Sequence, residues 1–246
     1  MANRIQLCGR LVVEIEGRRL EDDLPARQGR VLFAYLTANR DRPGGRAELI
    51  EAVWPHDLPA RPETALSALL SKLRRVLGPE LLDGRSSVQL RLPAGTWIDL
   101  EAAGEAIHRA ESAVARGDWQ GTWGPGQVAQ YVAKRGFLPG EDAPWIDEIR
   151  QRLEAIYLRA LEVRARAGLG LGGSELDTAE RSARSLISAS PYHESGYRFL
   201  MEVLAERGNA AEALQVYEQL RVLLRDELGT VPGEATQELH RRVLGA

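Results

Sequence analysis

The stretch PETALSALLSKLRRVLG, residues 62–78, predicts a helix with well-marked ends. Pro62 suits the first helical turn, and Gly78 followed by Pro79 is a stop signal. The leucines recur at spacings of three and four residues, which places them on one stripe that must be buried. This stripe consists of Leu66, Leu69, Leu70, Leu73 and Leu77.

The opposite face of the same helix carries short side chains followed by a basic end. It is formed by Thr64, Ser67, Ala68, Ser71, Lys72 and Arg75, with Arg74 beside them. A solvated helix face favours long helix formers such as Glu, Lys and Gln, and this face has few of them. One interpretation is a helix that is buried on one side and solvated on the other. The alternative is a face shaped to approach another molecule.

The flanking sequence supplies strands and two more helices. Alternating apolar residues in the first twenty positions predict short antiparallel strands. Helical spacing follows over residues 26–40 and 46–54. After the third helix, residues 88–92 alternate again, and residues 97–100 are predicted to return as the second strand of a hairpin. This order is that of a winged helix-turn-helix with an added N-terminal sheet.

From about Leu100 the chain is predicted to be helical to its end. The segments 117–127 and 135–145, rich in Gly, Pro and Trp, are expected to be packed loops between helices. Three pairs of residues separated by 34 positions indicate a tetratricopeptide-like repeat. These pairs are Ala179 and Ala213, Ala183 and Tyr217, and Leu186 and Leu220. The expected fold is mainly α, an α+β winged helix followed by an all-α tetratricopeptide-like domain.

Length and charge support a division into two domains, residues 1–97 and residues 98–246. The 246 residues are 44% hydrophobic, which suffices for two cores. The first part carries 15 Arg or Lys against 12 Asp or Glu, and the second carries 17 against 23. A mildly basic part and an acidic part favour different partners. The single cysteine, Cys8, and the absence of a long apolar run predict a cytoplasmic protein without a membrane segment.

No motif in the sequence predicts an enzyme, a cofactor or a metal site. GLGLGG, residues 168–173, matches the spacing of a dinucleotide fingerprint but follows a helical segment where that motif requires a strand, so a flexible loop between helices is expected. The four histidines have no metal-ligand spacing. The acid pairs at 141–142 and 147–148 are expected in a loop and in a first helical turn, where they stabilise a helix N-terminus.

The helix at 62–77 occupies the position of a recognition helix, between a helix-turn and a wing. Small side chains at Thr64, Ser67 and Ala68 allow its backbone to approach base edges in a major groove. Hydroxyl groups can bind bases or phosphates, and cations bind phosphates. The candidate DNA-binding residues are Thr64, Ser67, Ser71, Lys72, Arg74 and Arg75, flanked by Arg46, Arg85 and Arg91.

The sequence also resembles a known family. PARQGRVLFAYL, RAELIEAVWP and PETALSALLSKLRRVLG are similar to the OmpR-type winged helix of the AfsR/SARP family of bacterial transcriptional activators. RGFLPGEDAPWIDEIRQRLEAIYLRALE, and the run from NAAEALQVYEQLRVLLRDELGTVPGEATQEL to HRRVL, are similar to the bacterial transcriptional activator domain of that family.

The resemblance implies an activator that binds direct repeats in double-stranded promoter DNA as a side-by-side pair and recruits the RNA polymerase holoenzyme. It implies polymerase contacts for the loop PHDLPAR, residues 55–61. The sequence itself shows no receiver domain, so we expect control that is independent of a phosphorelay within this chain. The wing departs from the family pattern, because SSVQLRL lacks the usual Gly-Tyr. Larger relatives continue into an ATPase module, so a complete small regulator and a fragment stay open as alternatives.

Two other functions stay open from the sequence. One is a protein-interaction scaffold whose winged helix no longer binds DNA, which the near-neutral first domain and the altered wing favour. The other is a ligand-sensing regulator with a pocket near Trp119, Trp123 and Trp145, although tryptophans in such segments usually belong to a core.

Overall fold

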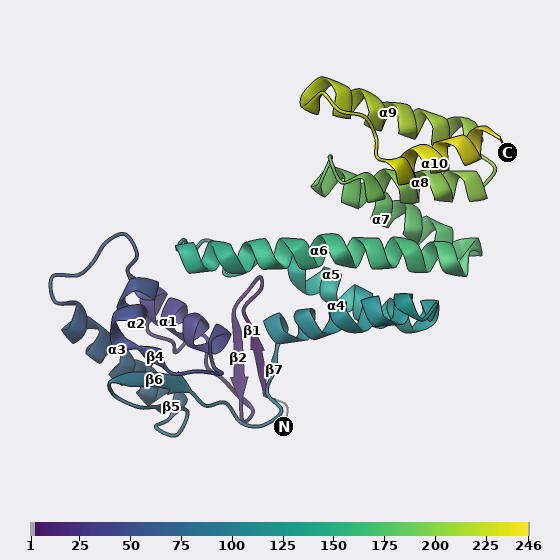
Figure 1. Ribbon diagram of the computed structural model, residues 1–246. Helices are drawn as coiled ribbons and strands as arrows, with labels where there is room; N and C mark the ends of the chain where they lie inside the picture. Colours follow the sequence, from purple (N-terminus) through teal and green to yellow (C-terminus); the bar gives the residue numbers. More distant parts are fainter. Residues whose placement is uncertain (1–2, 246) are drawn as a thin grey trace. The chain divides into compact units, whose positions relative to one another are not determined.

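A computed structural model describes residues 3–245, which are mainly helical with a small sheet region near the N-terminus (Figure 1). The described residues form two compact units. The first unit comprises the chain up to residue 102 together with residues 135–153. The helical unit comprises residues 103–134 and the chain from residue 154 onward.

The first unit begins with the predicted antiparallel strands, which are confirmed. Strand β1 (Arg4–Gln6) pairs with β2 (Val12–Ile15), and β2 pairs with β3 (Arg18–Arg19). A fourth strand, β7 (Trp97–Ile98), adds to β1 in parallel, so the order is β3-β2-β1-β7. The alternating apolar residues of β1 and β2 face the core, where Ile5, Val13 and Ile15 are buried.

Three helices and a second small sheet complete this part of the first unit. The three predicted helices are confirmed as α1 (Ala26–Ala38), α2 (Arg46–Val53) and α3 (Pro62–Leu77). The antiparallel sheet has the order β4-β6-β5, with strands at Gly44–Gly45, Ser87–Leu90 and Leu82–Asp83.

The expected pairing of residues 88–92 with residues 97–100 is wrong. Strand β6 forms its hairpin with β5 instead, and Asp99 begins a helix. The reason lies far away in sequence. The fully buried Asp99 carboxylate accepts hydrogen bonds from the backbone amides of Leu7 at 2.9 Å and Cys8 at 2.8 Å. These contacts hold the chain at β1, so β7 joins that sheet.

Residues 135–153 pack against the rest of the first unit, to which they belong. The amide of Leu138 donates to the carbonyl of Leu7 at 3.1 Å. The ring of Trp145 lies edge-on to Tyr35 and Phe137, with centroid distances of 5.0 and 5.6 Å. Residues 135–143 are outside regular helix, so the packed loop expected there is confirmed as far as the helix that begins at Pro144.

The remaining helices follow in chain order. They are α4 (Asp99–Ala115), α5 (Trp119–Lys134), α6 (Pro144–Leu171), a 3-10 turn η1 (Gly173–Glu175), α7 (Leu176–Ala189), α8 (Glu194–Glu206), α9 (Ala210–Leu228) and α10 (Glu234–Leu244). Helices α4 and α6 carry the chain from one unit into the other. Within the helical unit, alanines at 106, 110, 129 and 160 allow α4, α5 and α6 to pack closely.

The loop expected over residues 117–127 is wrong, because helix α5 begins at Trp119 and includes Pro125. Asp118 starts this helix: its carboxylate accepts the amide of Gly121 at 2.8 Å, as an N-cap residue does. Gly126 faces Val163 and Arg164 at distances that leave little room for a side chain. Its lack of a side chain therefore serves helix packing.

GLGLGG is also helical for most of its length, so the expected flexible loop is wrong up to Leu171, where α6 ends. A Cβ atom at Gly168 would lie 2.7 Å from the carbonyl oxygen of Glu175, and one at Gly170 would lie 2.4 Å from the indole of Trp119. Both glycines allow close contact with a neighbouring segment.

The residues of the 34-position repeat fall at matching positions of α7 and α9. Ala179 and Ala213 are fully buried, as are Leu186 and Leu220. The third pair differs, since Ala183 is fully buried and Tyr217 is half-buried, with its ring stacked on His240 at 3.8 Å.

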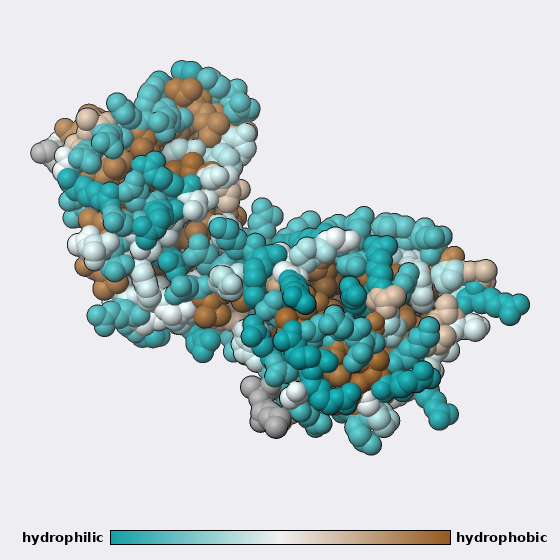
Figure 2. All heavy atoms as spheres, turned by 180° about the vertical axis from the view of Figure 1, so that it is seen from behind, coloured by the Kyte–Doolittle hydropathy of each residue, from teal (hydrophilic) through white to brown (hydrophobic). Residues whose placement is uncertain are grey.

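Hydrophilic side chains cover most of the face seen in Figure 2, with smaller hydrophobic areas between them. Within residues 3–245, none of the helices combines the length and apolar character needed to span a bilayer.

Candidate nucleic-acid interface

Helix α3 presents the two faces that its sequence predicts. All five stripe leucines, at 66, 69, 70, 73 and 77, are buried. The side chains of Thr64, Ser67, Ala68, Ser71, Lys72 and Arg75 are exposed, and Arg74 is half-buried. The helix ends at Gly78, whose φ of 100° favours glycine. Arg74 and Arg75 lie in its last turn, where the helix dipole favours cations.

Arg46 connects three segments at the N-terminal end of α3. Its Nε donates to a carboxylate oxygen of Glu63 at 2.6 Å, and its Nη2 donates to the Ser67 hydroxyl at 2.8 Å. Its Nη1 reaches the backbone carbonyl of Arg85, in the β5–β6 loop, at 3.3 Å. Arg46 therefore fixes the positions of α2, α3 and the hairpin loop relative to one another. Its N–H groups donate to acceptors of the protein itself, so they are not directed at a bound molecule.

Arg74 connects the other end of α3 to the same hairpin. Its Nε donates to the carbonyl of Leu82 at 3.2 Å, and its Nη2 donates to the carbonyl of Gly84. Both acceptors belong to the β5–β6 hairpin. Since Arg46 and Arg74 both bond to this hairpin, the loop at residues 84–85 lies alongside α3.

The tight turn of that loop depends on Gly84. Its φ is 88°, and a Cβ atom there would lie 1.9 Å from the carbonyl oxygen of Ser87. No other residue type fits this conformation without moving the backbone. The turn places Arg85 at an exposed position, where its backbone carbonyl accepts the hydrogen bond from Arg46.

The cations of the candidate site thus differ in whether their side chains already bond to other groups of the protein. Arg91 pairs with Asp83 across the hairpin at 3.0 Å. The side chains of Lys72, Arg75 and Arg85 have no ion pair or hydrogen bond within residues 3–245. These three are therefore available to bind an anion.

The hydroxyl groups on the exposed face bond within the helix. Ser67 donates to the carbonyl of Glu63 at 2.8 Å, and Ser71 donates to that of Ser67 at 2.9 Å. The Ser67 oxygen also accepts from Arg46, whereas the Ser71 oxygen keeps its lone pairs for a further hydrogen bond. These short side chains therefore let another molecule approach the helix backbone closely.

Helix α2, which precedes this face, is anchored by Glu48. The carboxylate accepts the amide of Gly45 at 3.2 Å and a guanidinium N–H of Arg42 at 3.1 Å. The hydrogen bond from Arg42 lowers the pKa of Glu48 to about 2, with a further contribution from Tyr35. The acid is thus held ionised at the start of α2, where the helix dipole also favours it.

The structure adds one candidate DNA-binding residue at the end of the loop 55–61, for which the sequence indicated polymerase contacts only. Arg61 immediately precedes α3, its side chain is exposed, and within residues 3–245 it has no ion pair or side-chain hydrogen bond. Its position directly before a predicted helix is a signal in the sequence. A residue of the preceding loop does not belong to the helical period, however, so the period does not select it. The sequence does not predict that Arg46 and Arg74 hold α3 to the β5–β6 hairpin.

Comparison with known proteins finds similarity to proteins named as transcriptional regulators. A family model described as the bacterial transcriptional activator domain matches residues 98–244. The regulatory protein AfsR of Streptomyces coelicolor is 34% identical over 220 residues, which is 89% of this chain and 22% of AfsR. The transcriptional regulatory protein EmbR of Mycobacterium tuberculosis is 25% identical over 257 residues, which is 97% of this chain and 62% of EmbR. The chain thus spans only part of these relatives.

A solved structure has the same fold. Mycobacterium tuberculosis EmbR, in complex with a low affinity phosphopeptide, superposes with a TM-score of 0.84. The match covers 99% of this chain and 65% of that one at 21% sequence identity. At this level of identity the likeness establishes the fold alone.

Proposed function

Because the chain belongs to the AfsR/SARP family of bacterial transcriptional activators, we propose that it is a transcriptional regulator that binds duplex DNA. The observation that carries the proposal is the exposed face of α3, where short side chains are followed by Lys72 and Arg75, two cations that have no ion pair within residues 3–245. The chain acts by binding and performs no chemical turnover.

The proposed complex places α3 in the major groove, which is wide enough for a helix. Thr64, Ser67 and Ser71 face the base edges, since their small side chains allow close approach. Lys72 and Arg75 bind phosphates on one side of the groove, and Arg85 binds the backbone from the hairpin. Arg61 adds a phosphate contact at the N-terminal end of α3.

Arg46 and Arg74 are positioning residues in this proposal. Their guanidinium groups bond to Ser67, Glu63 and the hairpin carbonyls, so they orient the contacting elements. Arg91 is paired with Asp83 and contributes mainly to the hairpin. The β5–β6 hairpin then serves as the wing of a winged helix-turn-helix.

The proposed division of labour assigns DNA binding to residues 1–97 and protein contacts to residues 98–246. Buried alanines and leucines at matching positions of α7 and α9 support tetratricopeptide-like helix pairs, which present surfaces to other proteins. RNA polymerase is the proposed partner, with binding to promoter repeats as a side-by-side pair. The loop at 55–61 is a second polymerase contact, supported by Leu58, which is 59% exposed.

The test begins with a duplex selected by the protein from a random pool, followed by mobility-shift titrations. Lys72→Ala/Arg75→Ala should lower the affinity for this duplex about tenfold or more. Arg10→Ala/Arg18→Ala is the matched control, because it removes the same charge from exposed positions in the N-terminal sheet region. Equal binding by both double variants would remove α3 from the interface, and failure to select any duplex would favour a protein-interaction scaffold.

A further inference from the structure

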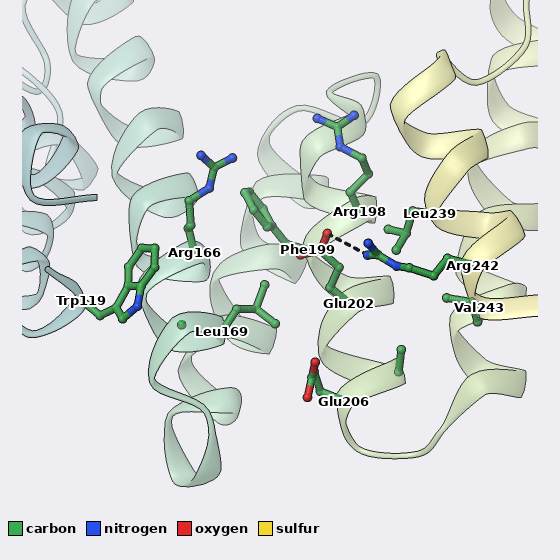
Figure 3. A pocket seen from close by; sticks show the side chains of 12 residues that line it. Trp119, Arg166, Leu169, Arg198, Phe199, Glu202, Glu206, Leu239, Arg242 and Val243 are labelled. Carbon is green, nitrogen blue, oxygen red and sulfur yellow. Dashed lines mark ion pairs between the residues drawn. The ribbon is translucent and has the colours of Figure 1, made fainter. Parts of the chain in front are cut away.

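The helical unit contains a cavity of about 760 Å³ that DNA binding through α3 does not use. Its walls come from the C-terminal half of α6, from α8 and from α10, with Trp119 of α5 at one side (Figure 3). Cavities of this size hold small organic ligands. All of its lining residues belong to the helical unit.

The apolar part of the cavity suits a flat ring. Trp119 and Phe199 line it together with Leu169, Leu239 and Val243. The fused edge of the Trp119 indole lies directly against Gly170, where a Cβ atom would approach to 2.4 Å. The missing side chain at Gly170 thus sets the position of the indole at the cavity wall.

Three arginines and two glutamates line the same cavity. Arg166 and Arg198 extend toward the same end of the cavity in Figure 3, and Glu206 lies toward the other. Arg242 approaches the carboxylate of Glu202 at 3.8 Å, which is too long for a hydrogen bond. The formal charge of this lining is +1, which matches a ligand with one negative charge.

The arginines retain donors for a ligand. Arg166 lies over the Phe199 ring at 5.6 Å, and within the described chain its guanidinium bonds to no hydrogen-bond acceptor. Arg198 uses one nitrogen to donate to the Thr236 hydroxyl at 3.1 Å. An arginine presents five N–H donors in a planar fork that fits a carboxylate.

Glu202 occupies the centre of this charged group. Burial raises the pKa of its carboxyl, and the positive charges of Arg242, Arg166 and Arg198 oppose that effect. A ligand anion would therefore compete with Glu202 for the same guanidinium groups.

We propose that this cavity binds a small organic monocarboxylate that carries an aromatic ring. The carboxylate lies at the end marked by Arg166 and Arg198, and the ring lies against Trp119 and Phe199. Such a ligand would make the helical unit an effector-binding module. The proposal is independent of DNA binding by α3, so either can fail without the other.

The test uses 2-naphthoate as the probe, titrated calorimetrically into the whole chain. We expect one saturable site with a Kd of about 1 mM or below. The neutral isostere 2-naphthamide should bind about tenfold more weakly, because it lacks the charge-assisted hydrogen bonds. Inorganic phosphate, which has no ring, should not saturate the site. Failure of 2-naphthoate to saturate by about 10 mM would overturn the proposal.

Substitutions of opposite sign separate binding from misfolding. Arg166→Gln should weaken 2-naphthoate binding about tenfold, whereas Glu202→Gln should tighten it severalfold by removing the competing carboxylate. A damaged fold cannot produce the second effect. Arg241→Gln is the matched control, since Arg241 lies on α10, pairs with Glu238 and is absent from the cavity wall. Equal affinity in Arg166→Gln and wild type would contradict the assignment.

A peptide could offer the same chemistry through its C-terminal carboxylate. A hexapeptide that ends in phenylalanine is therefore titrated alongside the probe. The proposal predicts that it binds no tighter than 2-naphthoate. Binding at least tenfold tighter, and lost in Arg166→Gln, would replace the small-molecule assignment by a peptide site.

Discussion

The guanidinium group of Arg46 donates a hydrogen bond to the hydroxyl of Ser67 at 2.8 Å, and so joins the start of α2 to the exposed face of α3. The same guanidinium group bonds to Glu63 and to the carbonyl of Arg85. A single side chain thus orients the helix and the hairpin loop that the proposed DNA complex needs together.

Arg46→Ala should reduce both stability and DNA affinity. We expect the free energy of unfolding of the first unit to fall by about 1 kcal/mol, since the ion pair with Glu63 is partly exposed to solvent. Lys72→Ala should lower DNA affinity and leave stability unchanged, because Lys72 has no partner within residues 3–245. Thermal unfolding and mobility shifts on both variants check this. An Arg46→Ala protein of wild-type stability would contradict its role in holding α2, α3 and the hairpin loop together.

Gly84→Ala should damage the hairpin. The positive φ and the contact of 1.9 Å with the Ser87 carbonyl predict a loss of about 2 kcal/mol or more, together with weaker DNA binding. Gly95→Ala serves as the control, since its φ of 75° is also unfavourable for alanine but nothing lies within 4 Å of the added Cβ. If the two variants unfold at the same temperature, the steric contact at Gly84 is unimportant.

Trp145→Phe tests the packing of residues 135–153 against the rest of the first unit. The indole Nε1 of Trp145 donates to the carbonyl of Ala52 at 3.0 Å, and phenylalanine lacks this donor. Loss of one such hydrogen bond costs about 1 kcal/mol of unfolding free energy. Trp97→Phe, at a residue that is 38% exposed, should cost less. Denaturant titrations of the two variants distinguish these outcomes, and a larger loss in Trp97→Phe would contradict the packing described.

The acid side of the stability profile should depend on Glu48. Its pKa is lowered to about 2 in the folded protein from an ordinary value of 4.5, so its contribution is present above pH 4.5. The contribution is lost as pH falls from 4.5 through 2, because the unfolded chain binds the proton first. Glu48→Gln should therefore be less stable than wild type at pH 6, with a difference that shrinks toward pH 3. A constant difference across this range would show that the carboxylate charge is irrelevant.

The sequence predicts local features of this fold well. The leucine stripe of α3 and the alternation in β1 and β2 are both patterns within a few residues, and both are confirmed. The pairing of Trp97–Ile98 with β1 escapes local patterns, because it depends on hydrogen bonds from the amides of Leu7 and Cys8, about ninety residues earlier, to Asp99. No local pattern contains that contact.

The loops wrongly expected at residues 117–127 and 168–173 both contain glycines. Gly and Pro in 117–127 and in GLGLGG lower helix propensity, and that argument favoured loops. In the structure, close packing against Trp119, Arg164 and Ala179 offsets this cost. The N-cap residue Asp118 was the one local signal for α5. The hypothesis of a ligand pocket near the tryptophans holds for Trp119, which lines a cavity. It does not hold for Trp145, which packs in the first unit.

For the candidate interface, the sequence identifies which residues share the exposed face but not their partners. Lys72 and Arg75 lie where the helical period places them. The engagement of Arg46 and Arg74 could not be predicted, because their acceptors belong to a hairpin whose position is set by the whole unit.

The most direct test of the central claim attaches a DNA-cleaving iron chelate to a cysteine that replaces Ser71. The native Cys8 does not interfere, since it is buried and burial raises the pKa of its thiol. If α3 lies in the major groove, labelled Ser71→Cys should cut the duplex within the segment that the protein protects, and labelled Arg18→Cys should not. DNA that is bound but left uncut by the Ser71→Cys label, or cut equally from Arg18→Cys, would contradict the account.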